Sequence, residues 1–108
     1  MRLVSRIEEI ILLSIWRLQD DAYGITILEE VEKATKKTWL TGSIYASLGR
    51  LLKRKLITSI EGEPSPERGG RRKIYYRLTT EGQKALLEIK RLNAQAWNDL
   101  PAFEIEKK

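Results

Sequence analysis

The chain has 108 residues, 20 of them basic and 15 acidic, and its formal net charge is +5. A chain of this length forms one domain with a modest hydrophobic core, and its positive charge suits an anionic partner. Cysteine and histidine are absent, which excludes disulfides, thiolate or imidazole metal sites and histidine-activated nucleophiles. We therefore expect no enzyme activity, cofactor or metal, and a cytoplasmic protein, because neither a signal pattern nor a membrane-length apolar run is present.

The first expected helix spans about residues 4–18 and is apolar on two sides. One helical stripe consists of Ile7, Ile11, Ile15 and Leu18, and a second face consists of Leu12 and Trp16. Either the helix is central in its own domain, or its second face meets a partner subunit. Asp20 and Asp21 are expected to end this helix and to cap the next one.

The second expected helix follows the Tyr23-Gly24 pair. Its inner side is predicted to contain Ile27, Leu28, Val31 and Ala34, and its outer side Glu29, Glu30 and Glu32. Because acids repel phosphates, this helix is predicted to support a neighbouring helix and not to contact an anion. Residues 35–40 are expected to form a turn, with or without a short strand.

The third expected helix covers residues 41–56 and has one apolar and one basic face. The core stripe is predicted to be Ile44, Leu48, Leu51 and Leu52, and the opposite stripe Ser43, Ser47, Arg50 and Arg54. That stripe has no acid, Thr41 is a candidate N-cap, and Gly42 leaves room for close approach. The pattern predicts a DNA recognition helix, and the alternative is a solvated amphipathic helix.

A basic hairpin is predicted after this helix. Two β-favouring runs, 56–61 and 74–79, enclose a turn-rich loop that contains Gly69-Gly70. The cations of the loop are Arg68, Arg71, Arg72 and Lys73. From residue 41 to residue 79 there are nine basic and three acidic residues, so the positive excess lies in this segment. A helix-turn-helix followed by such a loop predicts a wing that contacts the DNA backbone or a minor groove, whereas a basic loop alone is more often just solvated.

The last expected helix runs from Thr79 or Thr80 to Pro101. A seam of positions alternates in spacing between three and four, at Leu86, Ile89, Asn93, Ala96 and Leu100. Ala85, Leu92 and Trp97 widen its apolar side. This spacing predicts pairing with a second copy of the chain, and the alternative is that the helix folds back on its own domain. Trp16 and Trp97 are either interface packing or the walls of a crevice for a small aromatic effector.

Several strings resemble the PadR family of bacterial transcriptional regulators: D-A-Y-G-I, G-S-I-Y-A-S-L-G-R-L and G-G-R-R-K-I-Y-Y-R-L-T-T-E-G. The resemblance covers about residues 7–87, and the short single helix at the end is similar to the small subfamily. It implies a dimeric winged-helix repressor of stress, detoxification or efflux genes, which binds an operator of two inverted half-sites and in some members is released by an aromatic compound or drug. Two residues depart from the family pattern, Ala46 at a usual proline and Lys55 at a usual glycine, and the second removes a favoured left-handed helix cap.

These observations predict a mainly α fold with a small β-hairpin, namely a winged helix-turn-helix plus a C-terminal dimerisation helix. We expect a DNA-binding domain at 1–79, the dimerisation helix at 80–101 and a disordered tail at 102–108. The expected partners are double-stranded DNA with a palindromic operator, a second copy of the chain, and a small aromatic or drug-like effector, but no membrane.

The predicted DNA contacts are Thr41, Gly42, Ser43, Tyr45, Ser47, Arg50, Lys53, Arg54, Arg68, Gly70, Arg71, Arg72, Lys73 and Tyr75. The predicted dimer or effector crevice contains Leu12, Trp16, Ile89, Asn93, Ala96, Trp97 and Leu100. Two alternatives stay open, a winged-helix protein-interaction module without specific DNA binding and an RNA-binding winged helix.

Overall fold

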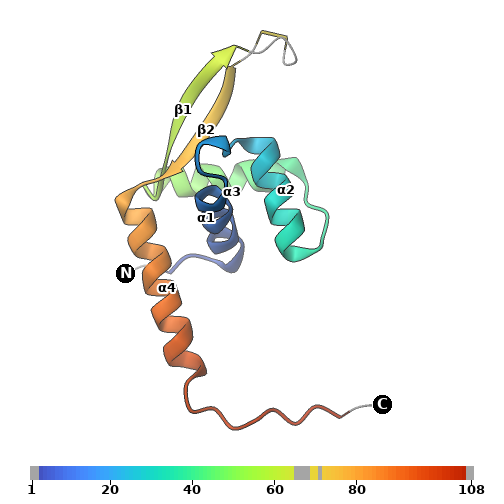
Figure 1. The fold of residues 1–108 in the computed structure, drawn as a ribbon, viewed down its shortest axis with the longest axis vertical. Helices are drawn as coiled ribbons and strands as arrows, with labels where there is room; N and C mark the ends of the chain where they lie inside the picture. Colours follow the sequence, from blue (N-terminus) through green and yellow to red (C-terminus); the bar gives the residue numbers. More distant parts are fainter. Residues whose placement is uncertain (1–2, 65–68, 71, 107–108) are drawn as a thin grey trace.

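The computed structural model describes residues 3–64, 69–70 and 72–106. Three helices are followed by a hairpin and a long last helix (Figure 1). The elements are α1 (Arg6–Leu18), the short 3-10 helix η1 (Gln19–Asp21), α2 (Gly24–Thr35), α3 (Thr41–Lys53), β1 (Ile57–Pro64), β2 (Arg72–Leu78) and α4 (Thr80–Trp97). The predicted order of helices, hairpin and terminal helix is confirmed. None of the helices in these described ranges is long and apolar enough to cross a membrane.

Helix α1 lies at the centre of the domain and contacts α2, α3, α4 and β2. It begins with a capping box, in which the Glu8 backbone N–H donates to Ser5 Oγ at 3.2 Å and the Ser5 N–H donates to Glu8 Oε1 at 2.8 Å. Because helices surround it, Leu12 is fully buried beside Ile11 and Ile15. For Leu12 the first alternative holds, a helix that is central in its own domain, whereas Trp16 on the next turn is half-exposed.

The start of α2 differs from the prediction, because Asp20 and Asp21 do not cap it. They belong to η1, and Tyr23 takes the N-cap position. Thr26 fastens this end, since its Oγ1 accepts from the Tyr23 N–H at 3.0 Å and donates to the Asp21 carbonyl at 2.6 Å. Of the predicted inner residues of α2, Ala34 on the last turn is exposed.

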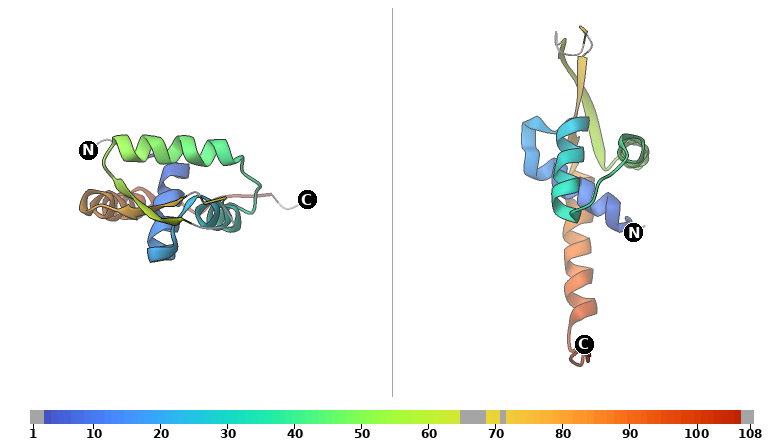
Figure 2. Two further views of the ribbon diagram at one scale, coloured as in Figure 1. Left: turned by 90° about the horizontal axis from the view of Figure 1, so that it is seen from above. Right: turned by 90° about the vertical axis from the view of Figure 1, so that its right-hand side faces the viewer.

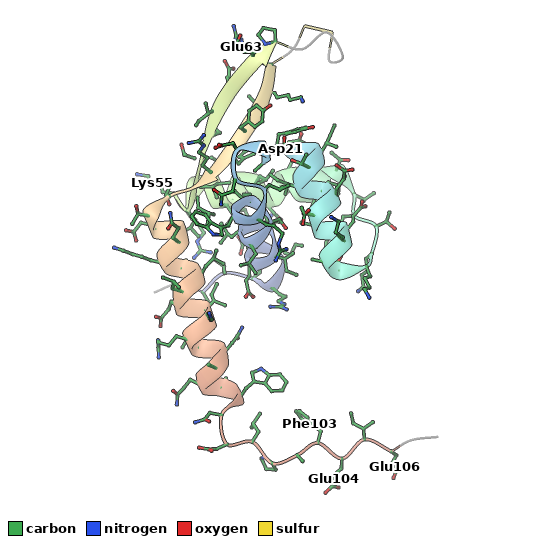
Figure 3. All side chains as sticks on the ribbon, viewed as in Figure 1. Asp21, Lys55, Glu63, Phe103, Glu104 and Glu106 are labelled. Atoms are coloured by element: carbon green, nitrogen blue, oxygen red, sulfur yellow. The ribbon has the colours of Figure 1, made fainter. Side chains whose placement is uncertain are left out.

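Helix α3 begins one residue after its N-cap, which is Leu40 and not Thr41 as predicted. It ends at Lys53, before the predicted residue 56, and Arg54 is its C-cap. The next residue, Lys55, lies at the junction with β1 (Figure 3) and has a left-handed backbone, with a φ of 59°. The Leu56 N–H then reaches back to the Leu51 carbonyl at 3.1 Å. Lys55 thus adopts the left-handed conformation that the usual glycine would adopt at this position. Because lysine carries a Cβ, this conformation costs roughly 1 kcal/mol.

Strands β1 and β2 pair antiparallel, with Ile57 opposite Leu78, and the pairing becomes irregular between Glu61 and Pro64. At its base β2 also joins the chain before α2, because the Tyr76 N–H donates to the Ala22 carbonyl at 2.8 Å. The hairpin projects from the helical body as an arm (Figure 2). Its base therefore has a fixed orientation relative to α2 and α3, which a wing requires.

Helix α4 leaves the body on the side opposite the hairpin tip (Figure 1). Only Gly82, Ala85 and Ile89 are buried along it, and every side chain from Asn93 to Glu106 is exposed. The helix ends at Trp97, earlier than the predicted Pro101, and Asp99 follows with a φ of 56°. The second half of α4 thus does not fold back on its own domain.

Residues 98–99 form a turn, and residues 100–106 continue as an extended segment without helix or strand. Phe103 points toward the body of the protein, and Glu104 and Glu106 point away from it (Figure 3). The Phe103 ring meets the Trp97 ring edge-on, with centroids 6.0 Å apart. The predicted disorder of residues 102–108 stays a prediction.

Candidate nucleic-acid interface

The face of α3 that points outward differs from the predicted one. The buried residues of α3 are Ile44, Ser47, Leu48 and Leu51. Its outward stripe at helical spacing is Gly42, Ala46, Gly49 and Lys53, all of them exposed. Ser47 is only 3% exposed, so the prediction that it lies on the exposed stripe is wrong. Successive residues turn by about 100°, which brings Ser47 onto the edge of the core stripe.

The first turn of α3 is open to solvent at Thr41, Gly42 and Ser43. A Cβ added at Gly42 or Gly49 would meet no atom within 4 Å. No acidic residue occupies this turn. The Ser43 N–H donates to the Leu40 carbonyl at 3.0 Å, and the N–H groups before it, together with the helix dipole, favour an acceptor or an anion. The helix therefore presents a smooth surface with a donor-rich end.

Tyr45 links α3 to the start of α2. A Cβ at Gly24 would overlap the Tyr45 phenol, so the Tyr23-Gly24 pair leaves the space in which this ring lies. The other side of Tyr45 is exposed. Burial raises the pKa of the Tyr76 hydroxyl, with a smaller contribution from Tyr45. Tyr45 thus packs on the start of α2 while it remains accessible from outside.

The two arginines near the end of α3 are both paired with Glu8 of α1. Glu8 Oε2 lies 3.9 Å from Arg50 Nε, and Glu8 Oε1 lies 3.9 Å from Arg54 Nη1. Burial raises the pKa of Glu8, but the hydrogen bonds from Ser5 and the charges of Arg54 and Arg50 outweigh it, so the pKa lies below its ordinary value. The side chain of Arg54 is only 17% exposed and that of Arg50 is 56% exposed. Arg54 is therefore mainly a structural cation, and Arg50 remains half available.

The wing carries its cations at the tip and at the base. Gly69 and Gly70 have φ values of 65° and 82°, which suits a tight turn, whereas Arg68 and Arg71 lie outside the described residues. Arg72 Nη1 donates across the hairpin to the Gly62 carbonyl at 3.2 Å. The wing tip therefore holds the Arg72 side chain against the opposite strand.

Aromatic rings anchor the base of the wing. The rings of Tyr23 and Tyr75 meet edge-on with centroids 5.6 Å apart, and Lys73 Nζ lies 4.3 Å from the centroid of the Tyr23 ring. Two of the predicted DNA contacts, Lys73 and Tyr75, thus also hold the wing against the start of α2.

Two cations that the sequence analysis did not assign lie next to α3. Lys36 and Lys37 are exposed in the turn before it, and Lys36 ends α2 with a φ of 55°. Consecutive lysines just before a helix N-terminus are the signal that could have indicated them. They extend the basic surface to the beginning of α3.

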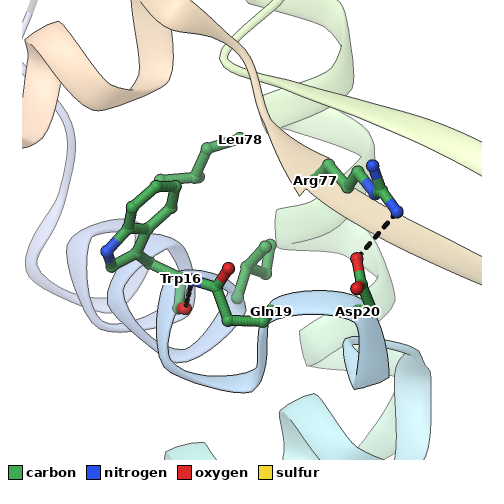
Figure 4. Close-up of a pocket in the computed structure, with 6 residues that line it drawn as sticks. Trp16, Gln19, Asp20, Arg77 and Leu78 are labelled. Atoms are coloured by element: carbon green, nitrogen blue, oxygen red, sulfur yellow. Dashed lines mark hydrogen bonds and ion pairs between the residues drawn. The ribbon is translucent and has the colours of Figure 1, made fainter.

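The residues predicted for a dimer or effector crevice separate into buried and exposed groups. Leu12 and Ile89 belong to the buried part of the domain, whereas Trp16, Trp97 and Leu100 expose 50%, 66% and 51% of their surface. Trp16 separates two hollows. The smaller hollow, of about 160 Å³, is also lined by Gln19, Asp20 and Arg77 (Figure 4). Asp20 and Arg77 form an ion pair there, with Oδ1 and Nη2 2.7 Å apart. The larger, of about 480 Å³, lies between α1 and α4 and is bounded by Leu13, Leu86 and Leu87. Trp97 borders a third hollow, which Trp16 does not line.

The model of the transcriptional regulator PadR-like family matches residues 11–88, most of the chain, including α2, α3 and both strands. The chain belongs to this family. A PadR family transcription regulator from Clostridium difficile is 28% identical, with a TM-score of 0.64, and the match covers 85% of this chain and 90% of the other. A PadR-like regulator from Bacillus cereus is 29% identical, with a TM-score of 0.68 and coverage of 83% and 82%.

A third similar structure, RosR from H. salinarum, shares the fold at 20% identity, with a TM-score of 0.70 and coverage of 93% and 83%. No curated protein sequence matches the chain. The predicted winged helix-turn-helix with a C-terminal helix is confirmed, and so is the predicted class, a transcriptional regulator and not an enzyme. Membership of the small subfamily stays a prediction.

Proposed function

We propose that this PadR-like regulator binds a palindromic DNA operator as a homodimer and represses transcription. The main support for DNA binding is the outward face of α3, which is smooth, has no acidic residue and is exposed at the N-terminus of the helix. Thr41, Gly42 and Ser43 are proposed to meet base edges in the major groove, with Tyr45 and Arg50 on either side of them. Phosphates would be held by Lys53, Arg68, Gly70, Arg71, Arg72, Lys73 and Tyr75, to which the geometry adds Lys36 and Lys37.

The dimer is proposed from the apolar surface that the single chain leaves exposed. Leu13 and Trp16 on α1 and Leu87, Trp97 and Leu100 on or just after α4 are between 40% and 67% exposed. A monomer rarely exposes so many large apolar side chains along one helix and its neighbour. Pairing through α4 would give two copies of α3, and for recognition helices about 34 Å apart the half-sites would lie one helical turn apart. The repressor role rests on the resemblance to the family.

The DNA contact predicts a strong salt dependence. If a dimer neutralises about eight phosphates, log affinity falls against log salt with a slope near −7. Fluorescence anisotropy of a labelled duplex, titrated with the protein at several potassium chloride concentrations, measures this slope. A duplex RNA of the same sequence is the control. Absence of DNA binding at low salt would favour the protein-interaction module, and equal affinity for the RNA would favour the RNA-binding alternative.

An effector is proposed for the larger hollow beside Trp16, because its walls combine apolar side chains with two opposite charges, those of Glu9 and Lys90. A flat aromatic molecule would stack on the indole, and either a carboxylate on it would pair with Lys90 or a cationic group would pair with Glu9. We expect such ligands to quench tryptophan fluorescence in the wild type and in Trp97→Phe, but not in Trp16→Phe. Unchanged fluorescence across a panel of phenolic acids and planar drugs would remove the effector from the proposal.

A further inference from the structure

The contact between α1 and α3 contains a carboxylate with an unusual position. Glu8 lies in the first turn of α1, its side chain is 9% exposed, and it faces the C-terminal half of α3. The Ser5 N–H holds one of its oxygens. In a DNA-binding domain a negative charge behind the reading helix opposes phosphate binding, so its place there requires a reason.

Arg50 is held from two sides. Its Nη2 donates to Ser47 Oγ at 2.8 Å, and its Nε lies 3.9 Å from Glu8 Oε2. Ser47 is buried, so the hydroxyl that accepts this bond is fixed. One edge of the guanidinium is therefore engaged by two different helices, while the rest of the side chain is in contact with solvent.

Arg54 does not share this arrangement. Its side chain is largely buried, and its Nη1 donates to the Leu3 carbonyl at 3.4 Å in addition to its approach to Glu8. Loss of the Glu8 charge would leave Arg54 in place but would release one of the two anchors of Arg50. If loss of the Glu8 charge changes DNA binding through one of its two arginine partners, we therefore expect that partner to be Arg50.

We propose that Glu8 is a positioning residue that restrains Arg50 and thereby raises the discrimination between operator and other DNA. This inference rests on the proposed DNA-binding function. An unrestrained arginine pairs with any phosphate within reach, which strengthens binding to every duplex. A restrained one gains a partner only where the groove presents an acceptor at its fixed position. Glu8 thus lowers non-specific affinity and leaves the specific contact intact.

The test is Glu8→Gln, since glutamine also serves at this position of a capping box and the helix start is retained. Binding is measured with a duplex selected from a random pool and with a scrambled duplex of equal length. For scrambled DNA we expect about tenfold tighter binding at low salt and a slope steeper by about 2 per dimer, because two arginines reach phosphates. The matched control is Glu9→Gln, which removes the same charge from the next residue, whose partner at 2.9 Å is Arg6 on its own helix. It should leave both duplexes unchanged.

A double-mutant cycle with Arg50→Ala decides whether Glu8 acts through Arg50. In that background Glu8→Gln should have no further effect on either duplex. An effect of equal size there, or an equal effect of Glu9→Gln, would overturn the inference in favour of general electrostatics. If Glu8→Gln proves unfolded in a thermal melt, Ser47→Ala removes the other anchor without a charge change and must also tighten scrambled DNA.

The two proposals fail in different ways. A wild type that binds no DNA contradicts the proposed function. A wild type that binds DNA, with a folded Glu8→Gln or Ser47→Ala that discriminates equally well, contradicts only the role of Glu8.

Discussion

Gly82→Ala is expected to destabilise the protein by about 3 kcal/mol, because the new methyl group has no room. A Cβ at Gly82 would overlap the carbonyl oxygen of Leu56, which is backbone and cannot swing aside. The same carbonyl accepts from the Thr79 N–H at 3.0 Å, and Thr79 Oγ1 donates to the Lys55 carbonyl at 2.8 Å. The first turn of α4 is thus packed directly on the junction between α3 and β1, and it must move if the methyl group is added.

Gly49→Ala is the matched control, since both changes add one methyl group to a helical glycine. Gly49 is exposed within α3 and a Cβ there meets nothing, so the substitution should stabilise the protein by about 1 kcal/mol. Urea unfolding of both variants, followed by far-UV circular dichroism, measures the two changes. Equal stability of the variants would mean that α4 does not approach Leu56 closely, and the direction in which α4 leaves the domain would then have to be revised.

The elements of this fold were largely accessible from periodicity. The apolar spacing of Ile44, Leu48 and Leu51 placed α3 correctly, because a stripe of large apolar residues has a single way to be buried. The alternation around Tyr76 similarly placed β2. Boundaries were less accurate, as at Trp97, where α4 ends although the helical pattern continues to Leu100. Solvent-exposed ends are not fixed by packing, so the pattern does not mark them.

The candidate site was only half accessible. Ser47 is small and polar, so its spacing predicts a surface position, but its burial depends on how the helices pack, which no local pattern contains. Arg50 and Glu8 are far apart in the sequence, and no sequence pattern predicts that these two charges form a pair. The resemblance to the family includes Gly24, but the reason for a glycine there is the ring of Tyr45, which only the three-dimensional structure places beside it. Residues that act through tertiary contacts are therefore the ones that sequence reasoning missed.

The second large effect is expected at the centre of the outward face of α3. Ala46→Glu should weaken DNA binding at least about 100-fold, because a carboxylate would enter the groove among phosphates and base acceptors, where like charges cost several kcal/mol. Ala46 is exposed and lies one turn from both Gly42 and Gly49, so the new side chain displaces nothing in the protein. The free energy of unfolding should therefore stay within about 0.5 kcal/mol of the wild type.

Ala34→Glu provides the comparison that makes this result specific to α3. Ala34 is also an exposed helical alanine, at the end of α2, and the substitution makes the same change in net charge. Its DNA affinity should fall by less than about tenfold, since a charge near Lys37 weakens only the phosphate contact and does not enter the groove. Anisotropy titrations with one duplex, together with thermal melts, compare the three proteins. Equal losses in both variants would reduce the effect to net charge, and unchanged binding by Ala46→Glu would mean that another surface contacts the DNA. A loss confined to Ala46→Glu would identify the stripe through Gly42, Ala46 and Gly49, and not the one through Ser43 and Ser47, as the face of α3 that enters the groove.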